Sequence, residues 1–190
     1  MAIFDLKNRV AFVTGGNGGI GLGMAKGLAG AGASIVIAGR NKTKAQSALS
    51  ELRSLGAPAE FVDLDVLDET SCRQAIQNAV GRFGRLDILV NNAGTTVRKQ
   101  PEDLTAQEWH LVMNTNLTGA FLCSQAAYPH MVRAGGGKII NIGSMMSVFA
   151  SSYAAPYAAS KAGIVQLAKS MAVAWAKGTY ATAIKIYFRL

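Results

Sequence analysis

The sequence has few of the residues that mark specialised classes of protein. Only 16% of its 190 residues are charged and 4 are proline, while half are hydrophobic, which argues against a disordered chain. Its two cysteines, Cys72 and Cys123, stand far apart and outside any metal-binding or disulfide motif. We therefore expect no metal site and no disulfide framework, and a reducing cytoplasm is the simplest setting for the protein.

Targeting signals and long apolar segments are also missing from the sequence. Residues 1–5 lack a basic region followed by a long apolar run, so we expect no signal peptide. No uncharged apolar stretch is long enough to cross a bilayer, so we expect a cytoplasmic protein with no membrane partner.

Acidic residues are absent after Glu108, and the formal net charge is +8. Two interpretations fit this imbalance: a basic surface that binds nucleic acid, or an uneven surface with no such partner. The basic residues after Glu108 are dispersed along the chain instead of clustered, which favours the second interpretation. We therefore expect no nucleic-acid partner.

Short apolar runs alternate along the chain with longer segments of helical periodicity. The expected strands are residues 10–13, 34–38, 60–66, 85–90 and 138–142, and the expected helices are 20–32, 42–55, 68–83, 105–133 and 157–177. This alternation predicts an α/β fold with a Rossmann-like, doubly wound parallel sheet. No interdomain linker stands out, so residues 1–177 are expected to form a single domain that holds the nucleotide site and the catalytic residues.

Two of the expected helices, 105–133 and 157–177, carry more apolar surface than one face of a sheet needs. Exposed apolar surface of that kind is typical of an interface between proteins. We therefore expect a homo-oligomer.

A glycine-rich turn at residues 14–21 joins the first expected strand to the first expected helix. Glycine lets the backbone turn sharply and approach a pyrophosphate, whose charge then lies at the N-terminus of the helix. A purely structural turn is the alternative, but the position between a strand and a helix favours dinucleotide binding.

Arg40 follows the second expected strand, where dinucleotide folds meet the adenosine ribose. An acidic residue there accepts hydrogen bonds from the ribose of NAD, whereas an arginine accommodates the 2′-phosphate of NADP. Arg40 therefore favours NADP over NAD. The alternative is a solvated arginine at the beginning of a helix.

Small and polar residues, 91–94, follow the fourth expected strand, at the edge of the sheet where such folds bind ligands. Further along, Asn116 lies within an apolar helical segment. A buried asparagine needs hydrogen-bond partners, so Asn116 marks either a structural network or a functional site.

Tyr157 and Lys161 are four positions apart, a spacing that places both side chains on one face of a helix. A free phenol titrates near pH ~10, and a neighbouring ammonium favours its deprotonated form, which suits a group that transfers protons near neutral pH. The same spacing is common on helix surfaces, so the rest of the sequence has to decide between the two interpretations.

Taken together, these motifs resemble the short-chain dehydrogenase/reductase family. The resemblance is carried by Thr14-Gly-x-x-x-Gly-Ile-Gly21, Asp65-Val66, Asn91-Asn92-Ala93-Gly94, Asn116 in Asn-Leu-x-Gly-x-Phe, Ser144, and Tyr157-x-x-x-Lys161. Ser144 precedes Tyr157 by 13 positions, the interval expected of that family. The motifs extend over about residues 5–177.

The resemblance implies an NAD(P)-dependent oxidoreductase in which Tyr157 is the general acid and base. Lys161 would hold the nicotinamide ribose and favour the phenolate, and Ser144 would hydrogen-bond the reacting oxygen. Asn116 would anchor a water relay behind Lys161. The implied cofactor-binding residues are Gly15, Asn17, Gly19, Ile20, Gly21, Arg40, Asp65, Val66, Asn92, Ala93, Gly94, Tyr157 and Lys161.

The implied partner is a small-molecule substrate. Residues 137–149 are similar to members of the family that act on sugar acids, such as gluconate and deoxygluconate dehydrogenases. Arg98 and Lys99 lie near the expected mouth of the site, where they could attract a carboxylate. The alternative is that both are ordinary solvated cations of a loop, and a steroid, acyl or simple sugar substrate also stays open.

After Lys177 the motifs end. The family would continue with a strand carrying an Asn and a Pro-Gly pair, a segment that covers the substrate and a final strand, and we expect the covering segment and final strand to be missing. Residues 178–190 are expected to be a divergent tail with a possible sixth strand. Three hypotheses stay open: an active dehydrogenase, a catalytically impaired dinucleotide-binding domain, and an interaction protein that keeps only the fold.

Overall fold

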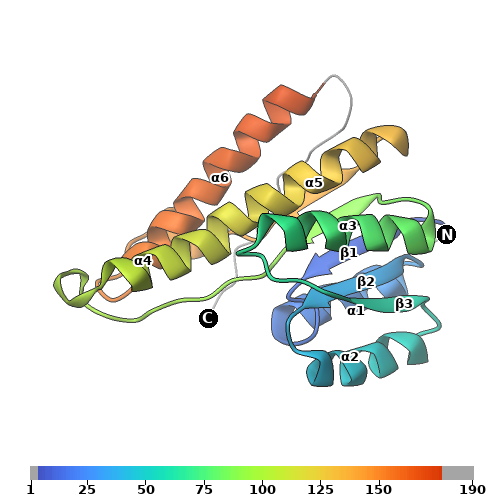
Figure 1. Cartoon of the computed structure of the whole chain (residues 1–190), viewed down its shortest axis with the longest axis horizontal. Coiled ribbons are helices and arrows are strands. Elements are labelled where there is room, and N and C mark those ends of the chain that lie inside the picture. Colours follow the sequence, from blue (N-terminus) through green and yellow to red (C-terminus); the bar gives the residue numbers. More distant parts are fainter. Residues whose placement is uncertain (1–3, 177–190) are drawn as a thin grey trace.

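Five parallel strands form the central sheet of the computed structural model, which describes residues 4–176 (Figure 1). Their order across the sheet is β3-β2-β1-β4-β5, so the direction of the strand order reverses between β1 and β4. The strands are Val10–Thr14 (β1), Ser34–Gly39 (β2), Ala59–Asp63 (β3), Ile88–Asn91 (β4) and Lys138–Asn141 (β5). The predicted single-domain, doubly wound parallel sheet is confirmed.

Helices cover both faces of the sheet. They are Gly19–Gly30 (α1), Lys42–Ser54 (α2), Glu69–Phe83 (α3), Ala106–Met113 (α4), Gly119–Arg133 (α5) and Ala155–Trp175 (α6), with short helical turns at Pro101–Asp103 (η1), Asn114–Thr118 (η2) and Met145–Ser147 (η3). One core contains α1 and α2, and the other contains α3 and α5. Along β1, Ala11 and Val13 face the first core while Val10 and Phe12 face the second, as the two-residue period of a strand requires.

Side-chain caps explain where several helices begin. The Asn41 side chain accepts a hydrogen bond from Lys44 N at the start of α2, and Asp68 accepts from the first turn of α3. Thr105 and Glu108 form a reciprocal capping box at the start of α4. Helix α1 is different, because no side chain caps its N-terminus.

The third expected strand is shorter than the 60–66 pattern predicted. Strand β3 ends at Asp63, and the chain then turns: Leu64 N donates to Gly39 O, and the Asp65 carboxylate accepts from Leu67 N at 3.0 Å. The alternation of apolar residues continues through this turn because Leu64 and Val66 pack inward. The sequence pattern therefore overestimated the strand.

The fourth expected strand begins later than predicted, at Ile88 instead of 85. Asp87, just before it, is buried and accepts hydrogen bonds from Arg85, from Arg9 and from the N–H of Val10. Burial alone would raise the pKa of Asp87, but these hydrogen bonds outweigh it and hold the pKa below its usual value. Residues 85–87 thus fasten the N-terminal ends of β1 and β4.

The long helix expected over 105–133 is interrupted. A π-helical turn at Asn114–Thr118 separates α4 from α5. Within it Asn116 is buried, and its amide bonds to residues outside the helix. An inserted residue of this kind rotates a helix locally without ending it, and such turns are frequent at functional sites.

Helix α6 packs against α4 and the π turn and extends beside α5 (Figure 1). Tyr128 of α5 stacks on Trp175 of α6, with ring centroids 4.3 Å apart. The prediction for residues 178–190 lies outside the described residues.

Candidate active site

The glycine turn after β1 is shaped by two close approaches. Gly15 adopts φ +63°, a left-handed conformation that favours glycine. A side chain on Gly21 would overlap the carbonyl oxygen of Gly15 and come within 2.5 Å of Asn92 Nδ2. The turn and the first turn of α1 therefore touch directly, which only glycine at position 21 permits.

The N-terminus of α1 can hold a phosphate. It lacks a side-chain cap and has no acidic residue in its first turn, so its free N–H groups and the helix dipole offer a site for an anion. With the glycine cradle beside it, this end of α1 fits the pyrophosphate of a dinucleotide. Gly15, Gly19 and Gly21 all lie in this turn and at the start of α1, and Ile20 extends from it with about half of its surface exposed.

Thr14 and Asn92 brace the turn from the end of β4. Asn92 Nδ2 donates to Thr14 O at 2.9 Å and to Gly15 O at 3.3 Å. In return, Thr14 Oγ1 accepts from the backbone N–H groups of Asn92 and Ala93, at 3.0 and 2.9 Å. Asn92 and Ala93, expected to touch a cofactor, thus hold the glycine turn in shape together with Thr14.

The neighbouring asparagine faces the opposite way. Asn91 is buried, and its Nδ2 donates to Asn141 Oδ1 at 2.8 Å and to Ser124 Oγ at 2.9 Å. Successive residues of a strand point to opposite sides, so the Asn-Asn pair supplies one group to the core and one to the cleft. The first asparagine joins β4, β5 and α5.

The region expected to hold adenosine lies at the ends of β2 and β3. Arg40 is exposed, and its Nη1 lies 4.0 Å from an Asp65 carboxylate oxygen. Asn17 donates from Nδ2 to Asn41 O at 3.2 Å and so ties the glycine turn to the start of α2. Val66 packs on Gly119, where a Cβ would come within 2.8 Å of it.

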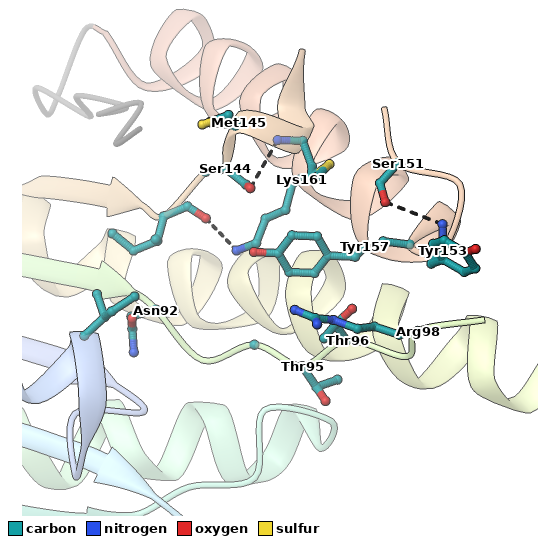
Figure 2. Close-up of a pocket in the computed structure, with 16 residues that line it drawn as sticks. Asn92, Thr95, Thr96, Arg98, Ser144, Met145, Ser151, Tyr153, Tyr157 and Lys161 are labelled. Carbon is teal, nitrogen blue, oxygen red and sulfur yellow. Dashed lines mark hydrogen bonds between the residues drawn. The ribbon is translucent and has the colours of Figure 1, made fainter. Parts of the chain in front are cut away.

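A cleft of about 760 Å³ opens beside the glycine turn. Its lining residues come from α1, the segment after β4, the segment after β5 and the start of α6: Ile20, Asn92, Gly94, Thr95, Thr96, Arg98, Ile142, Gly143, Ser144, Met145, Met146, Ser151, Tyr153, Ala154, Tyr157 and Lys161. Figure 2 shows the Tyr157 hydroxyl and the Lys161 amino group pointing toward the same part of this cleft. Ser144, Tyr157 and Lys161, predicted as catalytic, therefore share one cavity.

Lys161 is held by backbone beneath the cleft. Its Nζ donates to Ile142 O at 2.6 Å and lies 5.7 Å from the centre of the Tyr157 ring (Figure 2). Burial in this position lowers the pKa of Lys161 from 10.5 to about 8, because desolvation disfavours the charged form. The ammonium form still predominates at pH 7.

Ser144 and Lys161 are linked by a third side chain, Ser147. The N–H of Ser144 donates to Ser147 Oγ at 3.2 Å, and that hydroxyl donates to Lys161 O at 2.7 Å. The Ser144 hydroxyl oxygen accepts from Met146 N at 3.2 Å. The short helix η3 thus fixes Ser144 against α6, a link that no spacing in the sequence indicates.

Asn116 does not line the cleft. Its side chain forms two hydrogen bonds with the backbone of Thr95, at 2.8 and 2.9 Å, and its Nδ2 donates to Ser160 Oγ at 3.0 Å. Ser160 in turn donates to Tyr157 O at 2.8 Å. The structure therefore gives Asn116 a positioning contact with the loop after β4 and with the turn of α6 that carries Tyr157.

The two cations expected at the mouth of the site, Arg98 and Lys99, lie in different surroundings. Arg98 lines the cleft, whereas the ammonium of Lys99 pairs with Glu108 at 2.6 Å, and this hydrogen bond lowers the pKa of the Glu108 carboxyl. Of the two alternatives left open for these cations, Arg98 is placed where it can meet a carboxylate, whereas the ammonium of Lys99 is already paired with Glu108. Adjacent residues in an extended loop point apart, which the sequence alone does not assign to one side or the other.

Several lining residues were missed from the sequence: Thr95, Thr96, Ile142, Gly143, Met145, Met146, Ser151, Tyr153 and Ala154. Those after β4 and β5 follow from one rule, since the carboxyl ends of parallel strands meet at the ligand edge of the sheet. Ser151, Tyr153 and Ala154 carry no such signal, because they enter through the loop before α6.

The two cysteines are neighbours in space. Cys72 and Cys123 lie 3.7 Å apart between their sulfur atoms, on α3 and α5. The sequence predicts no disulfide framework and does not indicate this contact, because 51 positions separate the two residues. In residues 4–176 no group of three or more His, Cys, Asp or Glu side chains could hold a metal ion.

None of the helices within residues 4–176 has the length and the apolar character needed to cross a bilayer.

Known proteins that are similar to this chain include named dehydrogenases. A gluconate 5-dehydrogenase of Gluconobacter oxydans (strain 621H) is 38% identical over 175 residues, which cover 92% of this chain and 68% of that protein. The 2-dehydro-3-deoxy-D-gluconate 5-dehydrogenase of Escherichia coli (strain K12) is 39% identical over 178 residues, 93% of this chain and 70% of that protein.

A similar solved structure is that of a gluconate 5-dehydrogenase from Burkholderia cenocepacia J2315, in complex with NADP and tartrate. It superposes with a TM-score of 0.91 and is 41% identical, with 97% of this chain and 73% of that chain covered. Residues 9–186 match the family model for short chain dehydrogenases, so the match continues past Lys177, where the motifs end. The chain belongs to the short chain dehydrogenase family of oxidoreductases.

Proposed function

We propose that the protein interconverts a carbonyl and a secondary alcohol with NADP(H) and acts on a sugar acid. The observation that carries the proposal is the meeting of Ser144, Tyr157 and Lys161 in one cleft beside the glycine turn. A dinucleotide whose phosphates lie at the start of α1 extends along the carboxyl ends of the strands, toward these three side chains.

The chemistry follows from what each group can donate. When bound, the nicotinamide supplies or accepts the hydride. In reduction Tyr157 gives its hydroxyl proton to the carbonyl oxygen, and in oxidation its phenolate takes the proton from the alcohol. Ser144 Oγ already accepts from Met146 N, so its own hydrogen is available to the reacting oxygen.

Lys161 supports the tyrosine by charge. Its ammonium stabilises the phenolate that forms during proton transfer. Within the described residues the ammonium group makes one hydrogen bond, to Ile142 O, so its other N–H donors are available to the ribose hydroxyls. Asn116 acts behind this pair by holding the Ser160 turn of α6; a water relay anchored there is the role that the family resemblance gives it.

NADP is proposed over NAD on the chemistry of Arg40. Its guanidinium is exposed at the end of β2 and can pair with a 2′-phosphate in a bidentate manner. Asp65 follows β3 beside it and would contact adenine. The gluconate 5-dehydrogenase from Burkholderia cenocepacia was solved with NADP, which supports the same choice.

A sugar acid is proposed because the charged side chains that line the cleft are basic. Arg98 brings a guanidinium into it, while none of the described residues that line it is acidic, so an anionic substrate is favoured. Thr95, Thr96 and Ser151 add hydroxyl groups that suit a polyhydroxy chain. The names of the related gluconate and deoxygluconate dehydrogenases point to the same class.

Titration of the purified chain with NADPH and NADH, followed by a panel of sugar acids, neutral sugars and ketones, tests the proposal. We expect tighter binding of NADPH and turnover of a sugar acid. Tyr157→Phe should lower kcat by about a thousandfold and leave NADPH binding intact, because only the proton transfer is removed. Saturable NADPH binding without turnover of any compound would favour an impaired dinucleotide-binding domain, and no binding at all would favour a protein that keeps only the fold.

We also propose a homo-oligomer. Leu111, Phe121 and Val173 are exposed by 45%, 38% and 81%, and they lie on α4, α5 and α6. Apolar side chains on adjoining helices are typical of a surface covered by a second copy. Sedimentation over a range of protein concentrations tests this, and a single monomeric species throughout would refute it.

A further inference from the structure

The contact between Cys72 and Cys123 is the feature that the reaction does not use. Both side chains are buried, at 1% and 0% exposure, and Cys123 Sγ donates to Cys72 Sγ across 3.7 Å. A disulfide needs about 2.05 Å between the sulfur atoms. The sulfur atoms must therefore approach by about 1.7 Å, through rotation of the two side chains and movement of α3 and α5 toward each other.

Small residues follow each cysteine along its helix. Ala75 and Ala79 of α3 and Ala127 of α5 are buried in the same core cluster. Alanine allows two helices to approach closely, because no long side chain separates their backbones.

The cysteine pair also contacts the turn after β3, which contains Asp65 and Val66. Cys72 Sγ donates to Asp65 O at 3.8 Å, and Ser71 Oγ, one residue earlier, accepts from Asp65 N at 3.0 Å. On the other side Val66 packs on Gly119, four positions before Cys123 along α5. Both helices that carry the cysteines therefore hold the Asp65–Val66 turn.

The two thiols differ in acidity. The hydrogen bond that Cys72 accepts from Cys123 lowers the pKa of Cys72, although burial opposes this effect. The same bond and burial raise the pKa of Cys123. Cys72 Sγ accepts the hydrogen of Cys123, a contact that would stabilise a thiolate at Cys72, so Cys72 is the sulfur expected to react first.

We propose that Cys72 and Cys123 are a modification site, which peroxide converts into an intramolecular disulfide that loosens the Asp65–Val66 turn and weakens dinucleotide binding. The Cys72 thiolate attacks one oxygen of hydrogen peroxide, the O–O bond breaks, and hydroxide departs. Cys72 is then a sulfenic acid. The Cys123 sulfur then attacks the Cys72 sulfur and water leaves. In total two thiols lose two electrons and two protons, and one peroxide becomes two water molecules.

The turn is affected because the disulfide has no thiol hydrogen. Cys72 can then no longer donate to Asp65 O, and its sulfur moves toward α5, away from the turn. The effect on the dinucleotide depends on the proposed function, in which Asp65 contacts the cofactor. Formation of the disulfide does not depend on it.

The experiment uses the full chain, reduced and then exposed to hydrogen peroxide. After catalase treatment the protein is denatured, labelled with N-ethylmaleimide and weighed by mass spectrometry. Because the chain has only two cysteines, an unlabelled monomer lighter by two hydrogens identifies this disulfide. In parallel, NADPH titration of the oxidised protein should give a Kd raised roughly threefold to tenfold, the size of one hydrogen bond, and dithiothreitol should restore it.

Single substitutions provide the controls. Cys72→Ala lacks the donor to Asp65, so we expect the reduced variant to bind NADPH about as weakly as the oxidised protein. Cys123→Ala keeps that donor, so it should bind as the unsubstituted chain does and form no intramolecular disulfide.

Each outcome decides a different part of the proposal. Two maleimide labels after peroxide, or a gain of oxygen instead of a loss of hydrogen, would overturn the modification site. A disulfide with unchanged NADPH affinity would overturn the coupling to the turn. If the reduced chain does not bind NADPH at all, the proposed function fails, while the maleimide count still decides whether the disulfide forms.

Discussion

The two halves of the cleft are built in opposite ways. The nucleotide half is made of backbone: a glycine turn and an uncapped helix end lie within one continuous segment, residues 14–21. The reaction half is made of side chains, and Arg98, Ser144 and Lys161 come from three separate segments. The nucleotide half depends on positions where a side chain is absent, whereas the reaction half depends on particular side chains that other residues hold in place.

This difference shows where each half is vulnerable. A single added methyl group is expected to damage the nucleotide half. The reaction half tolerates added volume better but depends on the charge and hydrogen bonding of a few groups. Four substitutions test that contrast, from the largest expected effect to the smallest.

Gly21→Ala tests the backbone half most severely. Its methyl group would overlap Gly15 O and crowd Asn92 Nδ2, so the turn must open. We expect NADPH binding to weaken by about a hundredfold or more and the free energy of unfolding to fall by about 1–3 kcal/mol, measured by titration and urea denaturation. The matched control is Gly23→Ala, because a Cβ there meets nothing within 4 Å. That variant should bind normally and gain up to about 1 kcal/mol; equal losses in both would contradict a role for the close approach.

Lys161→Met tests the charge buried in the reaction half. Burial lowers the pKa of Lys161 from 10.5 to about 8, so between these values the unfolded chain binds the proton and the folded chain does not. The cost of burying the ammonium is fully present below pH 8 and is relieved as the pH rises toward 10.5. Stability should therefore rise over this window, by on the order of 3 kcal/mol at most, relative to the variant.

Urea unfolding of both proteins from pH 7 to pH 10 measures that difference. The remaining titrating groups are common to the two chains, so they cancel in the comparison. Curves that stay parallel across the window would show that the buried site does not penalise the charge.

Arg98→Gln tests whether the reaction half selects an anion. Loss of a charged hydrogen bond to a carboxylate should lower kcat/KM for a sugar acid about tenfold to a hundredfold, with little change for a neutral ketone. Lys99→Gln is the matched control, because its ammonium pairs with Glu108 outside the lining of the cleft. An equal loss for acid and neutral substrates would indicate that Arg98 supports the loop and does not bind the substrate.

Arg40→Ser tests a charged side chain on which the nucleotide half is expected to rely. The guanidinium is exposed, with 74% of its side chain accessible, so its pairing with a 2′-phosphate is partly screened by solvent. We expect the ratio of NADPH to NADH affinity to fall about tenfold, with NADH binding unchanged. The same loss for both nucleotides would assign Arg40 a structural role.

The sequence predicted the elements well where the hydrophobic period was uniform. The five strands and the fold class follow from short apolar runs between helical segments, because strands buried on both faces must be apolar throughout. It misjudged the ends of strands, as at Asp63 and Asp87, since a turn or an ion pair that stops a strand depends on residues far away in the chain. The π turn at Asn114–Thr118 was missed for the same reason, because Asn116 finds its partners in Thr95 and Ser160.

The sequence by itself indicated the sheet and the glycine turn, because these depend on local spacing or on the absence of a side chain, and its resemblance to a family pointed to Ser144, Tyr157 and Lys161. Only the tertiary structure decided that Arg98 enters the cleft while Lys99 leaves it, that Ser147 joins Ser144 to α6, and that Cys72 meets Cys123. These contacts join segments that are distant along the chain. Their geometry is set by the packing of helices against the sheet, which no local pattern encodes.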